Sequence, residues 1–423
     1  MIAMETLREV LVDNRKLVEG KRIFQREIKL PAIPRGVLVG IRRSGKSYLL
    51  YTEMQRRLKE GQTWDDMLYL NFEDERLLGF DVADFNKILE AHAELSGRAA
   101  YPALFLDEIQ IIENWERFAR RIADAEAEIY VTGSNAKMLS IDVAATLGGR
   151  FMNIQVFPLS FAEVLQVTAV PFDPSSLAST TGRAFVKQAF SQYLQNGGFP
   201  ECFQLREPQE YLNNLYQKIY LNDVAVRNGI TNILPLRVMF KKIADSIGQP
   251  LSFTRIANIL TSVGHRLSTP TVINYVSYAC DACLLLPVEN YYGKLRDRES
   301  QKKYYFADNG LVSLLRSDAK ADLLENLVAV ALLRKHGLQN AVFYFKHQVE
   351  VDFYLPGSET AIQVCLHLTK APETMKRELG AFAKLSKFLP VKRRIVITLE
   401  EESRIDTDCG VVEVMPAWRW LLT

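Results

Sequence analysis

The segment that decides the fold is Gly40-Ile41-Arg42-Arg43-Ser44-Gly45-Lys46-Ser47, which matches the pattern G-x-x-x-x-G-K-S. An apolar strand pattern ends at Val39 just before it, and a helical pattern opens at Tyr48 just after it. A loop in this setting binds phosphates, because its glycines let backbone N–H groups turn inward and the helix N-terminus adds positive partial charge. The sequence therefore predicts a nucleotide site made by residues 40–48.

Four residues have predicted roles in ATP hydrolysis. Lys46 is placed to reach the β- and γ-phosphates, and Ser47 to ligate Mg²⁺. A second apolar run ends in Asp107-Glu108. Asp107 is expected to hold the Mg²⁺ shell indirectly, through water, and Glu108 to polarise the attacking water as general base.

Two further positions allow more than one interpretation. A strand pattern ends in Thr132-Gly133-Ser134-Asn135, where Asn135 could hydrogen-bond the γ-phosphate or simply cap the following turn. Arg150 follows Leu147-Gly148-Gly149. It could act as an arginine finger on the nucleotide of a neighbouring subunit, which would require self-association. It could instead form an ordinary surface ion pair or a loop contact.

The composition is that of a multidomain globular protein. A chain of 423 residues with 48% hydrophobic and 24% charged residues predicts two or three domains. The net charge of +2 means that any nucleic-acid contact must come from local patches. No apolar run approaches the ~20 residues needed to cross a membrane. The charged N-terminus and five scattered cysteines favour a cytoplasmic location.

Five short apolar strands, separated by helical patterns, occupy the first part of the chain. They are expected at residues 37–39, 68–72, 103–106, 129–132 and 153–157. Such alternation predicts an α/β fold, with a parallel sheet covered by helices on both faces. We therefore assign residues 1–158 to a P-loop ATPase core. Residues 159–234 read as a helical lid, with an exposed loop over 173–182.

Residues 235–306 read as a winged helix-turn-helix. A helix opened by Ser252 precedes a third helix, which presents Thr271, Asn274 and Tyr275. A predicted hairpin follows, and basic residues crowd its turn and its second strand. These residues are Lys294, Arg296, Arg298, Lys302 and Lys303. A basic wing beside such a helix is a DNA-binding arrangement. Both surfaces could instead pack against neighbouring domains, or the basic residues could simply be solvated.

Residues 307–423 read as helix, three strands, helix and strand, which is the element order of restriction-endonuclease-type nucleases. Glu325 lies on the first helix and Asp352 on the second strand. Where such nucleases place Glu-x-Lys, this chain has Gln363-Val364-Cys365. A neutral amide is a poor ligand for Mg²⁺ and a thiol does not replace an ammonium, so this domain is predicted to be inactive.

Together these motifs resemble one family, the prokaryotic ATPases of the AAA superfamily that carry a C-terminal nuclease-like domain of unknown function. The resemblance covers nearly the whole chain. Besides residues 40–47 and 106–110, its motifs are Tyr69-Leu70-Asn71-Phe72-Glu73-Asp74, Thr132-Gly133-Ser134-Asn135-Ala136, Gly149-Arg150, Phe157-Pro158-Leu159-Ser160-Phe161, Tyr305-Phe306-Ala307-Asp308-Asn309-Gly310-Leu311, Glu325-Asn326 and Glu350-Val351-Asp352-Phe353. The resemblance implies ATP binding and hydrolysis, a winged helix and a nuclease-like end.

The leading functional hypothesis is a Mg²⁺-dependent ATPase that acts as a switch or motor on DNA. A second hypothesis is a nucleotide-gated signalling or regulatory scaffold, in which the wing and the nuclease-like domain bind proteins. A third is an ATP-dependent nuclease, with Glu325, Glu350 and Asp352 as its acids.

Overall fold

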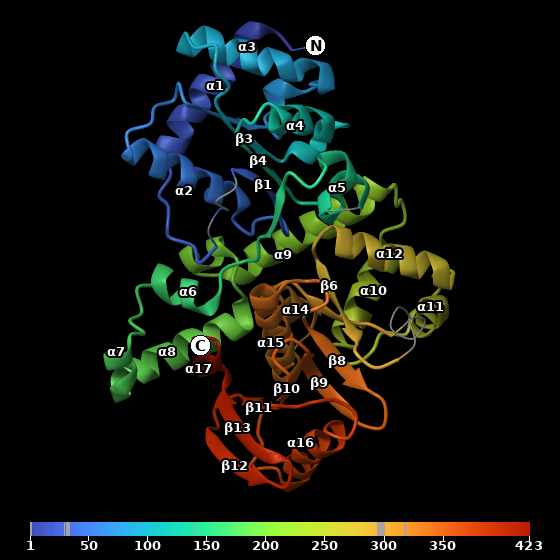
Figure 1. The fold of residues 1–423 in the computed structure, drawn as a ribbon. Helices are drawn as coiled ribbons and strands as arrows, with labels where there is room; N and C mark the ends of the chain where they lie inside the picture. Colours follow the sequence, from blue (N-terminus) through green and yellow to red (C-terminus); the bar gives the residue numbers. More distant parts are fainter. Residues whose placement is uncertain (1, 29, 31–33, 140, 294–300, 317–318) are drawn as a thin grey trace. The chain divides into compact units, whose positions relative to one another are not determined.

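The chain forms two compact units in a computed structural model that describes residues 2–28, 30, 34–139, 141–293, 301–316 and 319–423 (Figure 1). Unit 1 comprises Met1–Phe157 with Asp281–Cys283, and unit 2 comprises Pro158–Cys280 with Leu284–Thr423. Unit 1 thus ends one residue before the predicted end of the ATPase core. Within the described part of the chain, no helix is long and apolar enough to cross a membrane.

Unit 1 is built on a five-stranded sheet in which every pairing is parallel. The strand order is β2-β3-β4-β1-β5. The strands are β1 (Arg35–Val39), β2 (Met67–Asn71), β3 (Ala103–Asp107), β4 (Ile129–Gly133) and β5 (Met152–Gln155). The prediction of an α/β fold with a five-stranded parallel sheet is therefore confirmed.

Helices cover both faces of this sheet. They are α1 (Met4–Glu19), α2 (Lys46–Lys59), α3 (Phe85–Ser96), α4 (Trp115–Asp124) and α5 (Ile141–Leu147). In Figure 1, α1 and α2 lie on one side of the strands, and α4 and α5 on the other. Val18, Leu50 and Met54 from α1 and α2 pack on Phe105 and Tyr130 of the sheet, and all five are buried. This apolar packing fixes the strand ends that carry the polar residues.

The register brings those strand ends to one edge. Val39 at the end of β1 lies beside Gly133 at the end of β4, and Asn71 beside Asp107. Gly40 extends the first pair, because its N–H donates to the Gly133 carbonyl at 3.4 Å. The glycine-rich loop and the acids after β3 therefore share the carboxyl edge of the sheet, where open parallel sheets bind their ligands.

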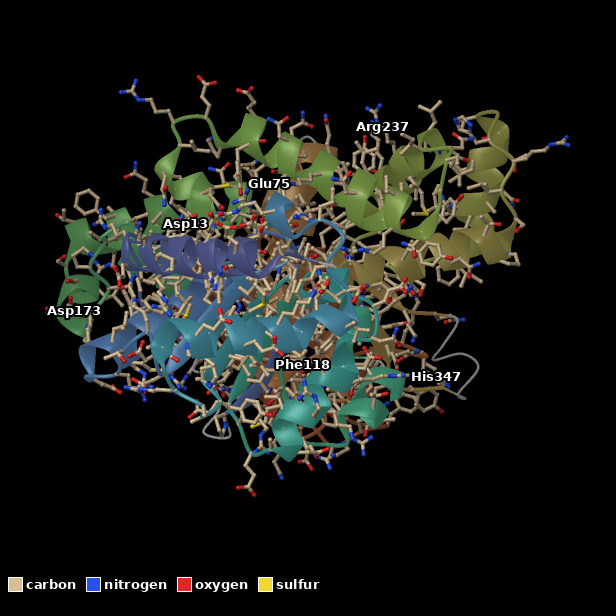
Figure 2. All side chains as sticks on the ribbon, turned by 90° about the horizontal axis from the view of Figure 1, so that it is seen from above. Asp13, Glu75, Phe118, Asp173, Arg237 and His347 are labelled. Carbon is tan, nitrogen blue, oxygen red and sulfur yellow. The ribbon has the colours of Figure 1, made fainter. Side chains whose placement is uncertain are left out.

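Unit 2 begins with helices. They are α6 (Phe161–Val167), α7 (Pro174–Ala178), α8 (Thr180–Asn196), α9 (Pro208–Lys218), a π-helical turn at Ile219–Ala225, α10 (Leu234–Ala244), α11 (Phe253–Ser262) and α12 (Thr269–Asp281), whose last residue groups with unit 1. The loop predicted over residues 173–182 is wrong, because Asp173 caps α7 and Ser179 caps α8. Asp173 is labelled in Figure 2, and its carboxylate accepts from the N–H groups of Ser175 and Ser176. The serine-rich composition is typical of a loop, but serine and aspartate also begin helices.

The second sheet has eight strands in the order β12-β13-β11-β10-β9-β8-β6-β7. The strands are β6 (Leu285–Asn290), β7 (Lys303–Phe306), β8 (Phe343–Lys346), β9 (Glu350–Leu355), β10 (Thr360–Val364), β11 (Arg393–Thr398), β12 (Ser403–Thr407) and β13 (Gly410–Pro416). The accompanying helices are α14 (Asn309–Leu315), α15 (Lys320–His336), α16 (Pro372–Leu385) and α17 (Ala417–Trp420). Strands β12 and β13 were not predicted.

The hairpin of the predicted winged helix is part of this sheet. Strand β6 pairs with β7 on one side and with β8 on the other. The sheet thus crosses the domain boundary predicted between residues 306 and 307. One assignment within the hairpin is wrong: Lys303, predicted on a basic wing, is fully buried. The division of unit 2 into a lid, a winged helix and a nuclease-like domain remains a prediction.

Candidate active site

The loop from Gly40 to Ser47 joins β1 to α2 and depends on its two glycines. A side chain at Gly40 would come within 2.0 Å of the Val156 carbonyl oxygen. Gly45 has a φ of 95°, in the left-handed region that other residues rarely adopt. Ser44 within the loop is fully buried, and among the described residues its hydroxyl has no hydrogen-bond partner. A phosphate oxygen is a suitable acceptor for such an orphaned group, so the loop fits the ligand that its sequence predicts.

Lys46 opens α2 and lies almost wholly inside the site, with 4% of its surface exposed. Its ammonium donates to the carbonyl oxygens of Gly40 at 3.0 Å and Ile41 at 3.2 Å. The same nitrogen lies 3.7 Å from Oε1 of Glu108. The fold therefore brings together the lysine and the acid that were predicted from separate segments.

Asp107 ends β3 and is held by hydroxyl groups. Tyr69 donates to its Oδ2 at 2.8 Å, Thr132 donates to its Oδ1, and the Ser47 hydroxyl bonds the same carboxyl group. Burial and the neighbouring Glu108 raise the pKa of Asp107, while these hydrogen bonds oppose the rise. Ser47 and Asp107 together offer the oxygen ligands that Mg²⁺ prefers, so the predicted pair fits this ion.

Glu108 follows Asp107 in a strained backbone conformation, with a φ of 52°. Its N–H donates to Thr132 Oγ1 at 3.1 Å, and the side-chain amide of Gln110 donates to its Oε2 at 2.5 Å. Burial alone would raise the pKa of Glu108, but Lys46, Gln110 and Arg42 outweigh it, and the pKa is lowered. The carboxylate is thus kept ionised, as a general base requires.

The sequence did not single out several residues that support this site. Tyr51 on α2 bonds the hydroxyl of Tyr69 at 3.0 Å, which extends the chain of hydroxyls behind Asp107. Arg26 is buried and donates to the carbonyl oxygens of Ser44 at 3.1 Å and Phe157 at 2.9 Å. Tyr69 was noted only as part of a family motif, and no local pattern marks Arg26.

The remaining predicted residues of this site lie around its rim. Arg42 pairs with Glu73 at 2.9 Å, and Tyr48 is exposed on α2. Arg43 is exposed with a φ of 65°. Asn135 accepts from the Lys137 N–H at 2.9 Å, in keeping with the capping interpretation.

Arg150 donates to Asp124 of the same chain at 2.6 Å. This contact is the surface ion pair that we considered beside the arginine-finger role. The action of Arg150 on the nucleotide of a neighbouring subunit remains a prediction, as does self-association.

The residues predicted to contact DNA fall into two groups. On α12, Asn274 is exposed, while Thr271 and Tyr275 are half-buried. Ser252 caps α11 as predicted, by accepting from the Arg255 N–H. Lys294, Arg296 and Arg298 lie outside the described residues.

The predicted remnant of a nuclease centre lies on β9, β10 and α15 of unit 2. Glu325 is on α15, Asp352 on β9 and Gln363 on β10. The side chain of Gln363 accepts from the Asp352 N–H at 2.8 Å, and the Val364 N–H donates to Asp352 Oδ2 at 2.8 Å. The residues that replace Glu-x-Lys are therefore integrated in the sheet.

The chain is similar to known proteins in sequence and, more weakly, in structure. An AAA domain family (AAA_14) matches residues 35–165, and a domain of unknown function (DUF8612) matches residues 187–322. An uncharacterized protein of Methanocaldococcus jannaschii, MJ1544, is 31% identical over 98% of this chain and 95% of its own length. An uncharacterized protein of Haemophilus influenzae is 33% identical over 71% of this chain and 74% of its own length.

Solved structures give a weaker likeness. The Walker-type ATPase paby2304 of Pyrococcus abyssi is 14% identical, with a TM-score of 0.42 over 75% of this chain and 96% of that one. The ORC2 protein of Aeropyrum pernix is 12% identical, with a TM-score of 0.34 over 77% and 92%.

The family assignment rests on the sequence matches and on the parallel sheet with its phosphate loop. The match to the Methanocaldococcus jannaschii protein spans nearly all of both chains, and the AAA domain match covers β1 through β5 and the residues that meet at their carboxyl edge. The chain belongs to the AAA superfamily of ATPases.

Proposed function

We propose that unit 1 binds and hydrolyses ATP with Mg²⁺. The observation that carries this proposal is the meeting of Lys46, Asp107 and Glu108 at the loop of residues 40–47. The Lys46 ammonium lies 3.7 Å from the carboxylate of Glu108, the buried candidate for the general base. Backbone N–H groups of the loop would cradle the phosphates, and Lys46 would exchange its two carbonyl partners for phosphate oxygens. Mg²⁺ held by Ser47 and Asp107 would neutralise charge on the β- and γ-phosphates.

Glu108 is the group that would take the proton of the attacking water. Gln110 holds one carboxylate oxygen of Glu108, and Lys46 lies beside the other. These contacts support an ionised Glu108 carboxylate that is oriented by protein groups and not by solvent. Removal of a positioned general base costs about 10²–10⁴-fold in rate.

The test is Glu108→Gln, which keeps the shape of the side chain and removes the base. We expect ATP affinity to stay within a few fold, while phosphate release slows by about 100-fold or more. Glu113→Gln, an exposed position soon after the site, is the matched control and should turn over ATP normally. Undiminished phosphate release by Glu108→Gln would remove this residue from its role.

We further propose that ATP turnover in unit 1 drives a switch or motor on DNA. Three helices followed by a hairpin support a winged helix-turn-helix, and the exposed Asn274 on the third helix supports a contact surface. Binding to random duplex DNA should weaken steeply as salt rises, and Asn274→Ala should change affinity less than removal of wing cations such as Arg296. No binding at low salt would favour the alternative, a nucleotide-gated scaffold for protein partners.

A further inference from the structure

Unit 2 contains a second lysine–carboxylate cluster that the ATPase proposal does not use. It joins Lys303 of β7 with Glu325 of α15 and with Glu350 and Asp352 of β9. The Lys303 ammonium lies 3.0 Å from Glu350 Oε1, 3.7 Å from Glu325 Oε1 and 3.8 Å from Asp352 Oδ1. One positive charge therefore stands at the point where three carboxylates from two elements converge.

The burial of Lys303 is what makes this arrangement unusual. The residue has no exposed surface, and its ammonium lies 5.1 Å from the centre of the Tyr344 ring. The 3.0 Å separation from Glu350 Oε1 is the shortest of its three charge contacts. Burying an ammonium is strongly unfavourable unless opposite charges compensate it. The carboxylates are thus needed to hold Lys303 in place.

Other partners already satisfy the same carboxylates. Tyr305 donates to Glu325 Oε1 at 2.9 Å, and Lys346 lies 2.8 Å from Glu350 Oε2. The Val364 N–H donates to the second oxygen of Asp352. Each acid therefore has one partner besides Lys303, and each keeps only 16–28% of its side chain exposed.

Gln363 fits this cluster as an amide and not as an acid. Its oxygen accepts from the Asp352 N–H at 2.8 Å, and its nitrogen approaches the Glu350 carbonyl oxygen at 3.4 Å. A glutamate could accept the first bond, but it would set a carboxylate against that carbonyl oxygen. Among the described residues, no three histidine, cysteine, aspartate or glutamate side chains are arranged to hold a metal ion.

A nuclease of the type that this chain resembles needs a divalent cation between its carboxylates, and the residues here do not fit one. We propose that the Lys303 ammonium takes the place of that cation, so that unit 2 carries a closed, metal-independent ion cluster in a domain that does not cut nucleic acid. The proposal is independent of ATP hydrolysis by unit 1. It assigns a role to Lys303, which the sequence placed on a DNA-binding wing.

The experiment measures Mn²⁺ binding to the full chain by electron paramagnetic resonance, without nucleotide. For the wild type we expect the same binding curve as for Asp352→Asn, since Asp352 takes no part in metal binding. Lys303→Ala should gain a Mn²⁺ site that the wild type lacks, because the loss of Lys303 leaves three carboxylates without their cation. The double variant Lys303→Ala/Asp352→Asn should lose it. Wild-type Mn²⁺ binding that depends on Asp352 would overturn the proposal.

A second measurement covers the case in which Lys303→Ala folds poorly. If the ammonium stands in for a cation, Mn²⁺ should raise the melting temperature of Lys303→Ala and leave that of the wild type unchanged. Equal shifts in both proteins would count against the proposal.

A plasmid assay tests the proposal without any lysine variant. The wild type should leave supercoiled plasmid intact with Mg²⁺ or Mn²⁺. Nicking that disappears in Asp352→Asn would overturn the proposal.

Discussion

Lys46 in unit 1 and Lys303 in unit 2 are both buried lysines beside carboxylates, yet their surroundings differ. Lys46 donates to two carbonyl oxygens of a glycine loop and lies 3.7 Å from one glutamate. Lys303 has three carboxylates within 3.8 Å and an aromatic ring beside it. A nearby acid and lysine are therefore not sufficient evidence for a catalytic site.

The partners of each lysine explain the difference. Carbonyl oxygens are neutral, so Lys46 can leave them for a phosphate at little electrostatic cost. Lys303 could leave its carboxylates only by exposing uncompensated charge inside the protein, which is unfavourable by several kcal/mol. The first site is arranged to exchange partners with a ligand, and the second to keep the partners it has.

The largest effect on ATP binding is expected for Lys46→Ala. Loss of a charged hydrogen-bond donor to phosphate should weaken ATP binding on the order of 100-fold, while the stability of unit 2 stays unchanged. Titration calorimetry with ATP and Mg²⁺ measures the affinity. Lys59→Ala, at the exposed end of the same helix, is the control and should bind normally. Normal ATP binding by Lys46→Ala would show that Lys46 does not exchange its partners for a phosphate.

Lys303→Met tests the other half of the comparison. Removing one partner of a buried ion cluster should destabilise unit 2 by about 3–5 kcal/mol, without altering ATP affinity. Lys346→Met is the matched control, because Lys346 also contacts Glu350 but is 40% exposed. It should cost about 1 kcal/mol or less. Hydrogen exchange in peptides from β9 and β10 would report both values, and equal losses in the two variants would contradict the role of burial.

The two lysines also show what a sequence can predict. Lys46 opens the helix after the phosphate loop, and Asp107 and Glu108 end and follow β3, so local pattern and strand order suffice to bring them together. Lys303 stands in a run of basic residues that is typical of a solvated surface. Its burial depends on Glu325, Glu350 and Asp352, which come later in the chain, and no local pattern reveals that pairing.

Other omissions have similar causes. Tyr69 contacts Asp107 through its hydroxyl, and Arg26 contacts Ser44 of the phosphate loop through its guanidinium, both from distant segments. Strand β12 is half-exposed, with the sequence Ser-Arg-Ile-Asp-Thr, and was missed because it lacks an apolar run. The sequence therefore predicts elements with strong hydrophobic patterning, while long-range polar contacts need coordinates.

A buried acid without a lysine beside it sharpens the comparison. Asp308 accepts from the N–H groups of Gly198 at 2.7 Å and Gly310 at 2.8 Å, and burial raises its pKa from 3.8 to about 7. Between those values the folded chain holds one more proton than the unfolded chain. The free energy of unfolding of unit 2 should therefore fall as pH rises through this window, by at most about 1.4 kcal/mol per pH unit.

Urea unfolding between pH 5 and pH 8 would measure this slope, with Asp308→Asn as the comparison. The variant loses one of the two acceptors and should be less stable throughout. Its pH dependence should nevertheless be flatter, because the other titrating groups of unit 2 are shared by both proteins. Identical slopes would show that Asp308 does not titrate in this window.

The smallest predicted effect concerns the hydroxyl groups of Tyr69 and Tyr51 behind Asp107. Asp107 is held by hydroxyl groups, whereas Asp352 lies beside the ammonium of Lys303. Tyr69→Phe removes a donor to Asp107 and leaves the Tyr51 hydroxyl without its partner, so it should cost about 1 kcal/mol in stability. If Tyr69 positions the carboxylate for Mg²⁺, the Mg²⁺ concentration needed for half-maximal ATP turnover should rise several-fold, with a smaller change in kcat. Tyr51→Phe leaves the bond to Asp107 in place and should keep the Mg²⁺ requirement of the wild type. If Tyr69→Phe needs no more Mg²⁺ than the wild type, the Tyr69 hydroxyl does not position Asp107. If Tyr69→Phe needs more Mg²⁺ while Lys303→Met does not, the Mg²⁺ dependence of ATP turnover belongs to unit 1.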